Sequence, residues 1–481
     1  MAASMMINPG IVKMEYAVRG AIPQRAAELA SQGRRIIPCH IGNPQALGQK
    51  PISFYRQVLS YLENPPGIER DRSLRRMVDR DSRPFGSLGD VFTSEYVLDL
   101  AEDLLSKLGT GLGAYTESRG PRFIRESIAT FIDARDRIES LRGTPSDPDS
   151  IFLTNGASEA VRYLIHLLIA DSHDGIMVPI PQYPLYSAVI KAARGVQVNY
   201  YPDEESGWTL ERPMLEESIK QAHEEGVVVK AIVVINPANP TGAILSQGSI
   251  REIVDFAEDH GLAIIADEVY QENVYGEEFV SFARIVGKRD VPLFSLHSTS
   301  KGFCGECGRR GGYLEIRNPP HLEDCRQSFT DVLLKEASVS LCSNTSGQVL
   351  TYLMVNPPPA GAIPHDRFIQ ERSGILSGLC ERASMIKASF DQMEGVTCFG
   401  RIGAMYLFPR LGRLPAETND FDYCMSLLEA TGLCTINGAG FGQRAGTQHL
   451  RIAFLPPREM LESVLPEWID FHNRYVMQAV N

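Results

Sequence analysis

Residues 227–242 read VVVKAIVVINPANPTG, a long apolar run that ends in two asparagine–proline pairs. Lys230 alone interrupts the apolar residues before Asn236, so no polar face alternates with them. A strand that is covered on both faces has this pattern, whereas a half-exposed strand alternates apolar and polar residues. The stretch therefore predicts a buried central strand, followed directly by Asn236 and Asn239, each held extended by the proline after it.

Residues 158–171 have a helical pattern, and five further apolar runs of similar length come after them in the sequence. They read GIMVPI (175–180), VQVNYY (196–201), LAIIAD (262–267), PLFSLHS (292–298) and GGYLEI (311–316). Helix-length segments separate them, which predicts an α/β fold with an open, mostly parallel sheet.

The pattern changes beyond about residue 345. A proline-rich break at 356–364 is followed by a helical stretch at 367–391 and by the strands GAMYLFPR (403–410) and HLRIAF (449–454). We expect a large domain at 66–345 and a smaller α+β domain at 346–481, which the segment 1–65 joins.

Composition excludes several classes of protein. The 481 residues are 43% apolar and 22% charged, as in ordinary globular proteins. A net charge of −12 argues against nucleic acid as a partner. The run ERDRSLRRMVDRDSR (69–83) interleaves acids with arginines, which favours a solvated helix face over a polyanion site. We find no membrane span and no secretion signal, and expect a cytoplasmic protein.

Cys304 and Cys307 form the one closely spaced pair among nine cysteines. A structural zinc site would need a second pair of ligands at similar spacing, and the sequence has none. The flanking Gly305 and Gly308 make a poor start for the helix that redox C-x-x-C motifs require. Lys301, which precedes the pair, is therefore the stronger candidate for a functional residue.

Ligands of open α/β sheets bind beyond the carboxyl ends of the strands. There, Ala157 and Ser158 open a helix after a short strand, which would make an anion cradle, although small residues also simply turn a chain. Asp267 ends a predicted buried strand. Its carboxylate either meets a cationic partner or caps a following helix.

A lysine, a strand-end carboxylate and an anion cradle with an arginine are together the parts that pyridoxal phosphate requires. Their order here resembles that of the fold type I aminotransferases. PIPQYPLYSAV, NPANPTG, ADEVYQENVY, HSTSKG with GECGRRGGY, GAGFGQRAGT and HLRIAFLPP look like the alanine aminotransferase branch of that class. VKMEYAVRG and IGNPQALGQKPISFYRQVL extend the resemblance nearly to the start of the chain.

The resemblance implies roles around the cofactor ring. Lys301 is implied to hold the cofactor through a Schiff base and then to serve as general base and acid. Asp267 is implied to pair with the pyridine nitrogen. Asn239 and Tyr270 are implied to hydrogen-bond the phenolic oxygen, and Tyr183 to stack on the ring.

The resemblance also implies a phosphate site, made by Ala157, Ser158, Ser298, Arg310 and, from a partner subunit of a homodimer, Tyr115. The family's G-x-R-x-G frame selects Arg310 over its neighbour.

For the substrate, the resemblance implies a site of Gly42, Asn239 and Arg451, in which Arg451 binds the α-carboxylate. The residues alone would favour a surface arginine at a strand edge for Arg451.

The implied activity is transfer of an amino group between alanine and 2-oxoglutarate in two half-reactions. The alternatives are an aminotransferase for another amino acid and a pyridoxal-phosphate-dependent lyase. SVSLCSN replaces the branch's SVRLCPP, and INGAGFG replaces VPGSGFG, so the departures fall at Ser340, Ser343, Asn344 and Asn437. The segment 63–109 also looks longer than usual. These departures bear on which substrate side chain the protein accepts.

Overall fold

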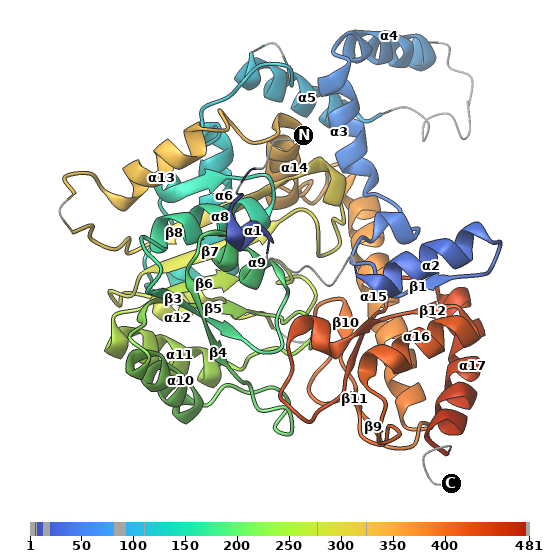
Figure 1. Ribbon diagram of the computed structural model, residues 1–481. Coiled ribbons are helices and arrows are strands. Elements are labelled where there is room, and N and C mark those ends of the chain that lie inside the picture. Colours follow the sequence, from blue (N-terminus) through green and yellow to red (C-terminus); the bar gives the residue numbers. More distant parts are fainter. Residues whose placement is uncertain are drawn as a thin grey trace.

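A computed structural model of the chain describes residues 5, 7–12, 20–80, 93–109, 111–276, 278–323 and 325–477. Its main element is a seven-stranded sheet with the strand order β2-β8-β7-β6-β5-β3-β4 (Figure 1). The strands are β2 (Ile151–Leu153), β3 (Asp174–Pro179), β4 (Val196–Tyr200), β5 (Val228–Ile235), β6 (Ala263–Asp267), β7 (Leu293–Ser298) and β8 (Gly312–Arg317). Neighbours from β4 to β7 are parallel, and β8 is antiparallel to both of its neighbours. The predicted α/β fold with a mostly parallel sheet is confirmed.

Alternate residues of β5 enter two different hydrophobic cores. Ile232 and Val234 pack on one face of the sheet, and Ala231 and Val233 pack on the other. The helices of the first core are α10 (Arg212–Glu224), α11 (Gln247–His260) and α12 (Phe282–Val286), and those of the second are α8 (Ala157–Leu168), α9 (Leu185–Ala192) and α13 (Phe329–Ser338). Because both faces are covered, β5 needs no polar side, as its sequence predicts.

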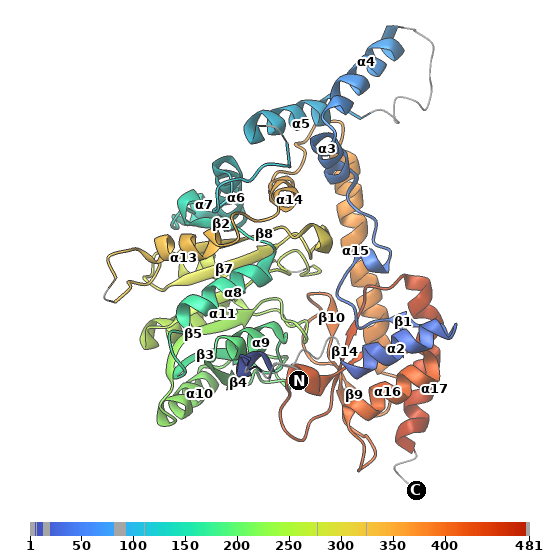
Figure 2. The ribbon, with the colours of Figure 1, turned by 45° about the horizontal axis from the view of Figure 1, so that its top comes forward.

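The C-terminal elements form a separate hydrophobic core beside the sheet (Figure 2). Its helices are α15 (His365–Phe390), α16 (Asp420–Thr431) and α17 (Arg458–Met477), and its three-stranded antiparallel sheet has the order β10 (Tyr406–Leu407), β14 (Leu450–Ala453), β13 (Ile436–Asn437). The predicted helix at 367–391 is confirmed as α15. The N-terminal segment joins this core: β1 (Ile37–Pro38) pairs in parallel with β12 (Leu433–Cys434), and α2 (Ala21–Ser31) packs on α16.

The predicted solvated helix is α4 (Pro66–Arg80), which projects from the body in Figures 1 and 2. Arg72 on α4 donates hydrogen bonds to Glu95, Asp99 and Glu102 of α5 (Glu95–Leu108). Arg70, Arg72 and Arg76 of this helix therefore pair with acids of the chain itself. Residues 81–83 of the basic run and 13–19 of VKMEYAVRG lie outside the described residues.

The remaining helices are α1 (Pro9–Val12), α3 (Ser53–Glu63), α6 (Arg122–Arg135), α7 (Ile138–Leu141) and α14 (Thr345–Val355). Among the helices that the structure describes, none combines the length and apolar character needed to cross a membrane.

Candidate active site

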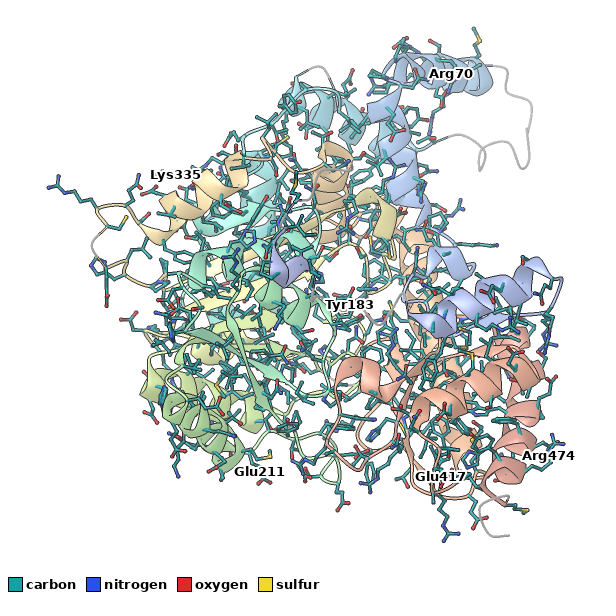
Figure 3. All side chains as sticks on the ribbon, viewed as in Figure 1. Arg70, Tyr183, Glu211, Lys335, Glu417 and Arg474 are labelled. Carbon is teal, nitrogen blue, oxygen red and sulfur yellow. The ribbon has the colours of Figure 1, made fainter. Side chains whose placement is uncertain are left out.

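A cavity of about 410 Å³ lies at the carboxyl ends of the parallel strands, where the sheet meets the C-terminal elements. Figure 3 labels one of its lining residues, Tyr183, near the middle of the molecule. Of the residues predicted from the sequence, those that line it are Gly42, Ala157, Ser158, Tyr183, Asn239, Asp267, Tyr270, Ser298, Lys301, Arg310 and Arg451. Tyr115 does not line it, and its side chain is 78% exposed.

Lys301 follows β7 and reaches across the cavity to the N-terminal segment. Its Nζ donates a hydrogen bond of 2.5 Å to the Gly42 carbonyl. A Cβ at Gly42 would collide with the Tyr406 hydroxyl and lie 3.4 Å from Lys301 Nζ. Only glycine therefore lets the N-terminal segment approach the amine this closely.

Asp267 ends β6 and is buried, with 5% exposure. Tyr186 on α9 donates a 2.7 Å hydrogen bond to Oδ2, whereas Oδ1 is buried with no hydrogen-bond partner among the described residues. Burial raises the pKa of the Asp267 carboxyl to about 6, and the Tyr186 hydrogen bond opposes that rise. No helix begins in the described residues 268–276, so the helix-cap interpretation is wrong.

An anion cradle forms where β2 gives way to α8. Arg310 Nη2 donates hydrogen bonds to the Asn155 carbonyl (2.6 Å) and to Ser158 Oγ (3.2 Å). A guanidinium thus lies at the N-terminus of a helix, where the first-turn N–H groups have no partners within the helix. Gly156 precedes this helix with a φ of +76°, and a Cβ there would lie 2.7 Å from Arg310 Nη2. Arg309 instead bonds Glu63, 2.7 Å away.

Arg451 lies in β14, the central strand of its small sheet, with 1% exposure. It donates hydrogen bonds to Asn239 Oδ1 (3.1 Å) and to the His40 carbonyl (2.9 Å). The Tyr406 and Phe441 rings cover the guanidinium, with centroids 4.2 and 4.7 Å from its carbon. The interpretation as a surface arginine is wrong.

Among the described residues, the hydrogen-bond acceptors of Arg451 are an amide oxygen and a backbone carbonyl, with no carboxylate, and its Nε makes no hydrogen bond. A buried cation without a counter-ion is costly unless a ligand supplies the negative charge. The arrangement therefore suits an anionic ligand in the cavity.

Two tyrosines of this site, Tyr186 and Tyr406, were not predicted from the sequence. The Tyr406 hydroxyl is 3.4 Å from that of Tyr270. Burial acts to raise the pKa of Tyr406, but the charges of Lys301 and Arg451 outweigh it and the pKa is lowered. Both tyrosines fall within quoted stretches, yet nothing in their spacing separates them from core aromatic residues.

The two paired cysteines have different surroundings. Cys304 is 1% exposed and packs in a hydrophobic core, whereas Cys307 lines the cavity and its thiol donates to the Ser300 carbonyl at 3.1 Å. All nine cysteines are free.

Two departures from the branch pattern lie close to the anion cradle and to β14. The Asn344 N–H donates to Asn155 Oδ1 at 2.8 Å, and its side chain caps α14 by accepting from Gly347 N at 3.0 Å. A proline at 344 could make neither bond. Asn437, also at a proline position of the branch, has its Nδ2 3.5 Å from Asp420 Oδ1. Both departures add hydrogen bonds at the edge of the site.

The sequence matches the family described as "Aminotransferase class I and II" over residues 90–465. Glutamate–glyoxylate aminotransferase 1 of Arabidopsis thaliana is 40% identical, over 99% of this chain and 96% of its own. A mitochondrial alanine aminotransferase of Saccharomyces cerevisiae is 42% identical, over 98% of this chain and 80% of its own. A solved alanine aminotransferase of Pyrococcus furiosus, 24% identical, has the same fold, with a TM-score of 0.77 over 98% of this chain and 100% of its own. The chain belongs to the aminotransferase class I and II family, whose cofactor is pyridoxal 5′-phosphate.

The predicted cytoplasmic location is wrong by the same comparison. Alanine aminotransferases about 40% identical to the chain over nearly its whole length, the yeast protein among them, are named as mitochondrial. Neither composition nor charge could have indicated this.

The cavity fits pyridoxal 5′-phosphate. The orphaned Asp267 Oδ1 is suited to a protonated ring nitrogen, the cradle beside Arg310 to a phosphate, and the Lys301 amine to the aldehyde. When bound, the cofactor supplies an electron sink for the α-carbon of an amino acid.

We expect Tyr186→Phe to shift the pH dependence of cofactor binding. The Tyr186 hydrogen bond favours the ionised form of Asp267, so its loss raises the Asp267 pKa further above about 6. As pH falls, the Asp267 carboxylate, which would pair with the ring nitrogen, is then lost at a higher pH than in the parent. The two apo-proteins are reconstituted with the cofactor between pH 5 and 8, and the absorbance of bound cofactor gives the pH midpoint of binding for each. Titration of the cofactor phosphate affects both proteins alike. Coincident curves would exclude a role for Tyr186.

Proposed function

We propose that the protein transfers an amino group between L-alanine and 2-oxoglutarate in two half-reactions. The observation that carries this proposal is the meeting of Lys301, Asp267 and Arg451 on one cavity of about 410 Å³. The identity of about 40% with alanine aminotransferases supports the choice of alanine.

Each residue then has a distinct task. Arg451 binds the α-carboxylate that both substrates carry, while Asn239 holds its guanidinium in place. Lys301 Nζ accepts a proton from the substrate α-carbon in one half-reaction and returns one in the other. Asp267 keeps the ring nitrogen protonated, and the cradle around Arg310 anchors the phosphate.

A second candidate is the transfer from glutamate to glyoxylate. It is favoured by the relative with that name, which is 40% identical over 99% of the chain. A matrix of amino donors (alanine, glutamate, serine, aspartate) against keto acids (2-oxoglutarate, pyruvate, glyoxylate) decides between the two. The highest kcat/KM is expected for alanine with 2-oxoglutarate. Failure of alanine as a donor would reject the proposal, and repeated release of keto acid and ammonia from serine without a keto-acid acceptor would indicate a lyase.

We also propose the predicted division into an N-terminal segment (1–65), a large domain (66–345) and a small domain (346–481). One boundary needs adjusting, because α14 packs against α6 and β8. We therefore count α14 with the large domain.

We propose that the active unit is a homodimer whose subunits share their sites. The supporting observation is a cluster of exposed apolar side chains beside the anion cradle. Tyr115, Val339 and Leu341 are 78%, 82% and 51% exposed. Hydrogen bonds from Thr345 to Leu112 and between Gln348 and Thr116 hold the two segments side by side.

We expect mixed dimers of Lys301→Ala and Tyr115→Ala subunits to be more active than the homodimer of either variant. One of their two sites combines an intact Lys301 with an intact Tyr115, provided that Tyr115 crosses the interface. Reassociation of the mixed variants, followed by an activity assay and sedimentation, measures this. An active monomer, or activity no greater than the sum of the separate variants, would contradict the proposal.

A further inference from the structure

A second polar network lies beside the cavity, around His449. This residue directly precedes β14 and stands two positions before Arg451, so the two side chains leave the strand on the same face. Its ring is 2% exposed and stacks on Phe408, with centroids 4.8 Å apart and 6° between the planes. Phe408 in turn contacts the Phe441 ring at 6.1 Å, edge to face, and Phe441 covers Arg451.

Both ring nitrogens of His449 face oxygen atoms. Nδ1 is 2.8 Å from Gln443 Oε1, and Nε2 is 2.9 Å from Glu204 Oε1. The Gln443 amide nitrogen donates to Asp420 Oδ2 at 2.8 Å, which directs its carbonyl oxygen to the imidazole. A neutral imidazole donates from one nitrogen only, so both bonds form together only with the imidazolium.

The network joins the sheet to the C-terminal elements. Glu204 lies in the loop after β4, whereas Asp420 begins α16. Asp420 also accepts a 2.9 Å hydrogen bond from Ala439 N, in the 3₁₀ turn Gly438–Phe441. His449 is therefore connected to Arg451 by the strand itself and by the turn that carries Phe441.

We propose that His449 is a positioning residue for Arg451, an inference that rests on the proposed role of Arg451 in binding the substrate carboxylate. The imidazolium ties Glu204 to Asp420 through Gln443 and so fixes the turn that holds Phe441 over the guanidinium. Loss of one of its bonds frees that turn, misaligns Arg451 and weakens substrate binding, while Lys301, Asp267 and Arg310 are untouched.

Charged side chains surround the His449 imidazole. The charged groups that face the imidazole across an adjoining cavity of about 280 Å³ are Asp203, Glu204, Glu205, Arg410 and Arg444, and Asp420 reaches it through Gln443. Arg410 pairs with Glu204 and Glu205 at 3.4 and 3.2 Å. Glu204 is thus held both by Arg410 and by His449.

The test compares His449→Phe with the matched control His472→Phe. His472 is also buried, at 1% exposure, and is bonded at 2.9 Å to both the Tyr423 hydroxyl and the Glu394 carbonyl, but it lies on α17 and does not line the cavity. We expect His449→Phe to raise KM for the amino acid and the keto acid by about tenfold, with kcat within about threefold. His449→Gln should recover part of the loss.

His472→Phe should change thermal stability but not KM. Should His449→Phe not fold, Glu204→Gln decides, with an expected rise in KM of about threefold. The inference is overturned if His449→Phe keeps the parental KM values. Where His449→Phe does not fold, parental KM values in Glu204→Gln overturn it. An equal rise of KM in His472→Phe would also overturn it. Arg451→Lys separates the two proposals. If it weakens both substrates while His449→Phe does not, the role of His449 alone fails, and if it weakens neither, the role of Arg451 fails first.

Discussion

Lys301→Ala is expected to lower turnover by more than about four orders of magnitude, because the two roles proposed for Lys301, acid–base catalysis and the covalent bond to the cofactor, are lost together. The Lys301 amine lines the cavity and is 2.5 Å from the Gly42 carbonyl. No other lysine lines the same cavity in the described part of the chain, so no second amine can replace it. The measurement is steady-state turnover, together with the absorbance of bound cofactor before and after borohydride reduction.

Two controls separate this result from a loss of folding and from cysteine chemistry. Lys335→Ala removes a surface lysine on α13, labelled in Figure 3, and should leave turnover unchanged. Cys304→Ser alters the buried member of the cysteine pair and should retain activity without added metal. Reducible cofactor in Lys301→Ala, or loss of activity in Cys304→Ser that metal restores, would contradict the assignment of Lys301.

The fold was predictable where the same apolar pattern, typical of strands covered on both faces, recurred along the chain. The apolar run in β5 and its relatives predicted buried parallel strands because helices on both faces leave no polar side. The pairing of β1 with β12 was not predictable from pattern, since a two-residue strand carries no periodicity and its partner lies almost 400 residues away.

The site was predictable to the extent that strand ends determine it. Asp267 and Lys301 follow neighbouring parallel strands, so their side chains meet at one edge of the sheet. Tyr406 and Gly42 come from the separate C-terminal core and from the N-terminal segment, so their place in the cavity depends on how the two cores dock. The Tyr186 hydrogen bond to Asp267 depends likewise on the packing of α9 against β6.

Arg451→Lys is expected to lower kcat/KM for the amino acid and for the keto acid together, by about one to two orders of magnitude each. Lysine keeps the positive charge but loses the planar fork that binds a carboxylate through two hydrogen bonds. A hydrogen bond to a charged group contributes about 1.5 to 3 kcal/mol, which sets the scale of the loss. Cofactor content should stay at the parental level, because Arg451 lies in β14 and makes no hydrogen bond to Lys301, to Asp267 or to the cradle of Arg310.

The two half-reactions, measured separately in single turnovers, provide the decisive comparison. Alanine and 2-oxoglutarate share the α-carboxylate and differ in their side chains, so an arginine that binds the carboxylate must affect both. Arg458→Lys, a surface change at the start of α17 in an ion pair with Glu462, controls for the substitution itself and should affect neither. Loss of a single half-reaction would show that Arg451 binds the side chain of one substrate and not the α-carboxylate that both substrates share. Loss of cofactor would show that the guanidinium supports the ring through Asn239, because that amide is its one direct hydrogen-bond partner among the predicted cofactor-binding residues.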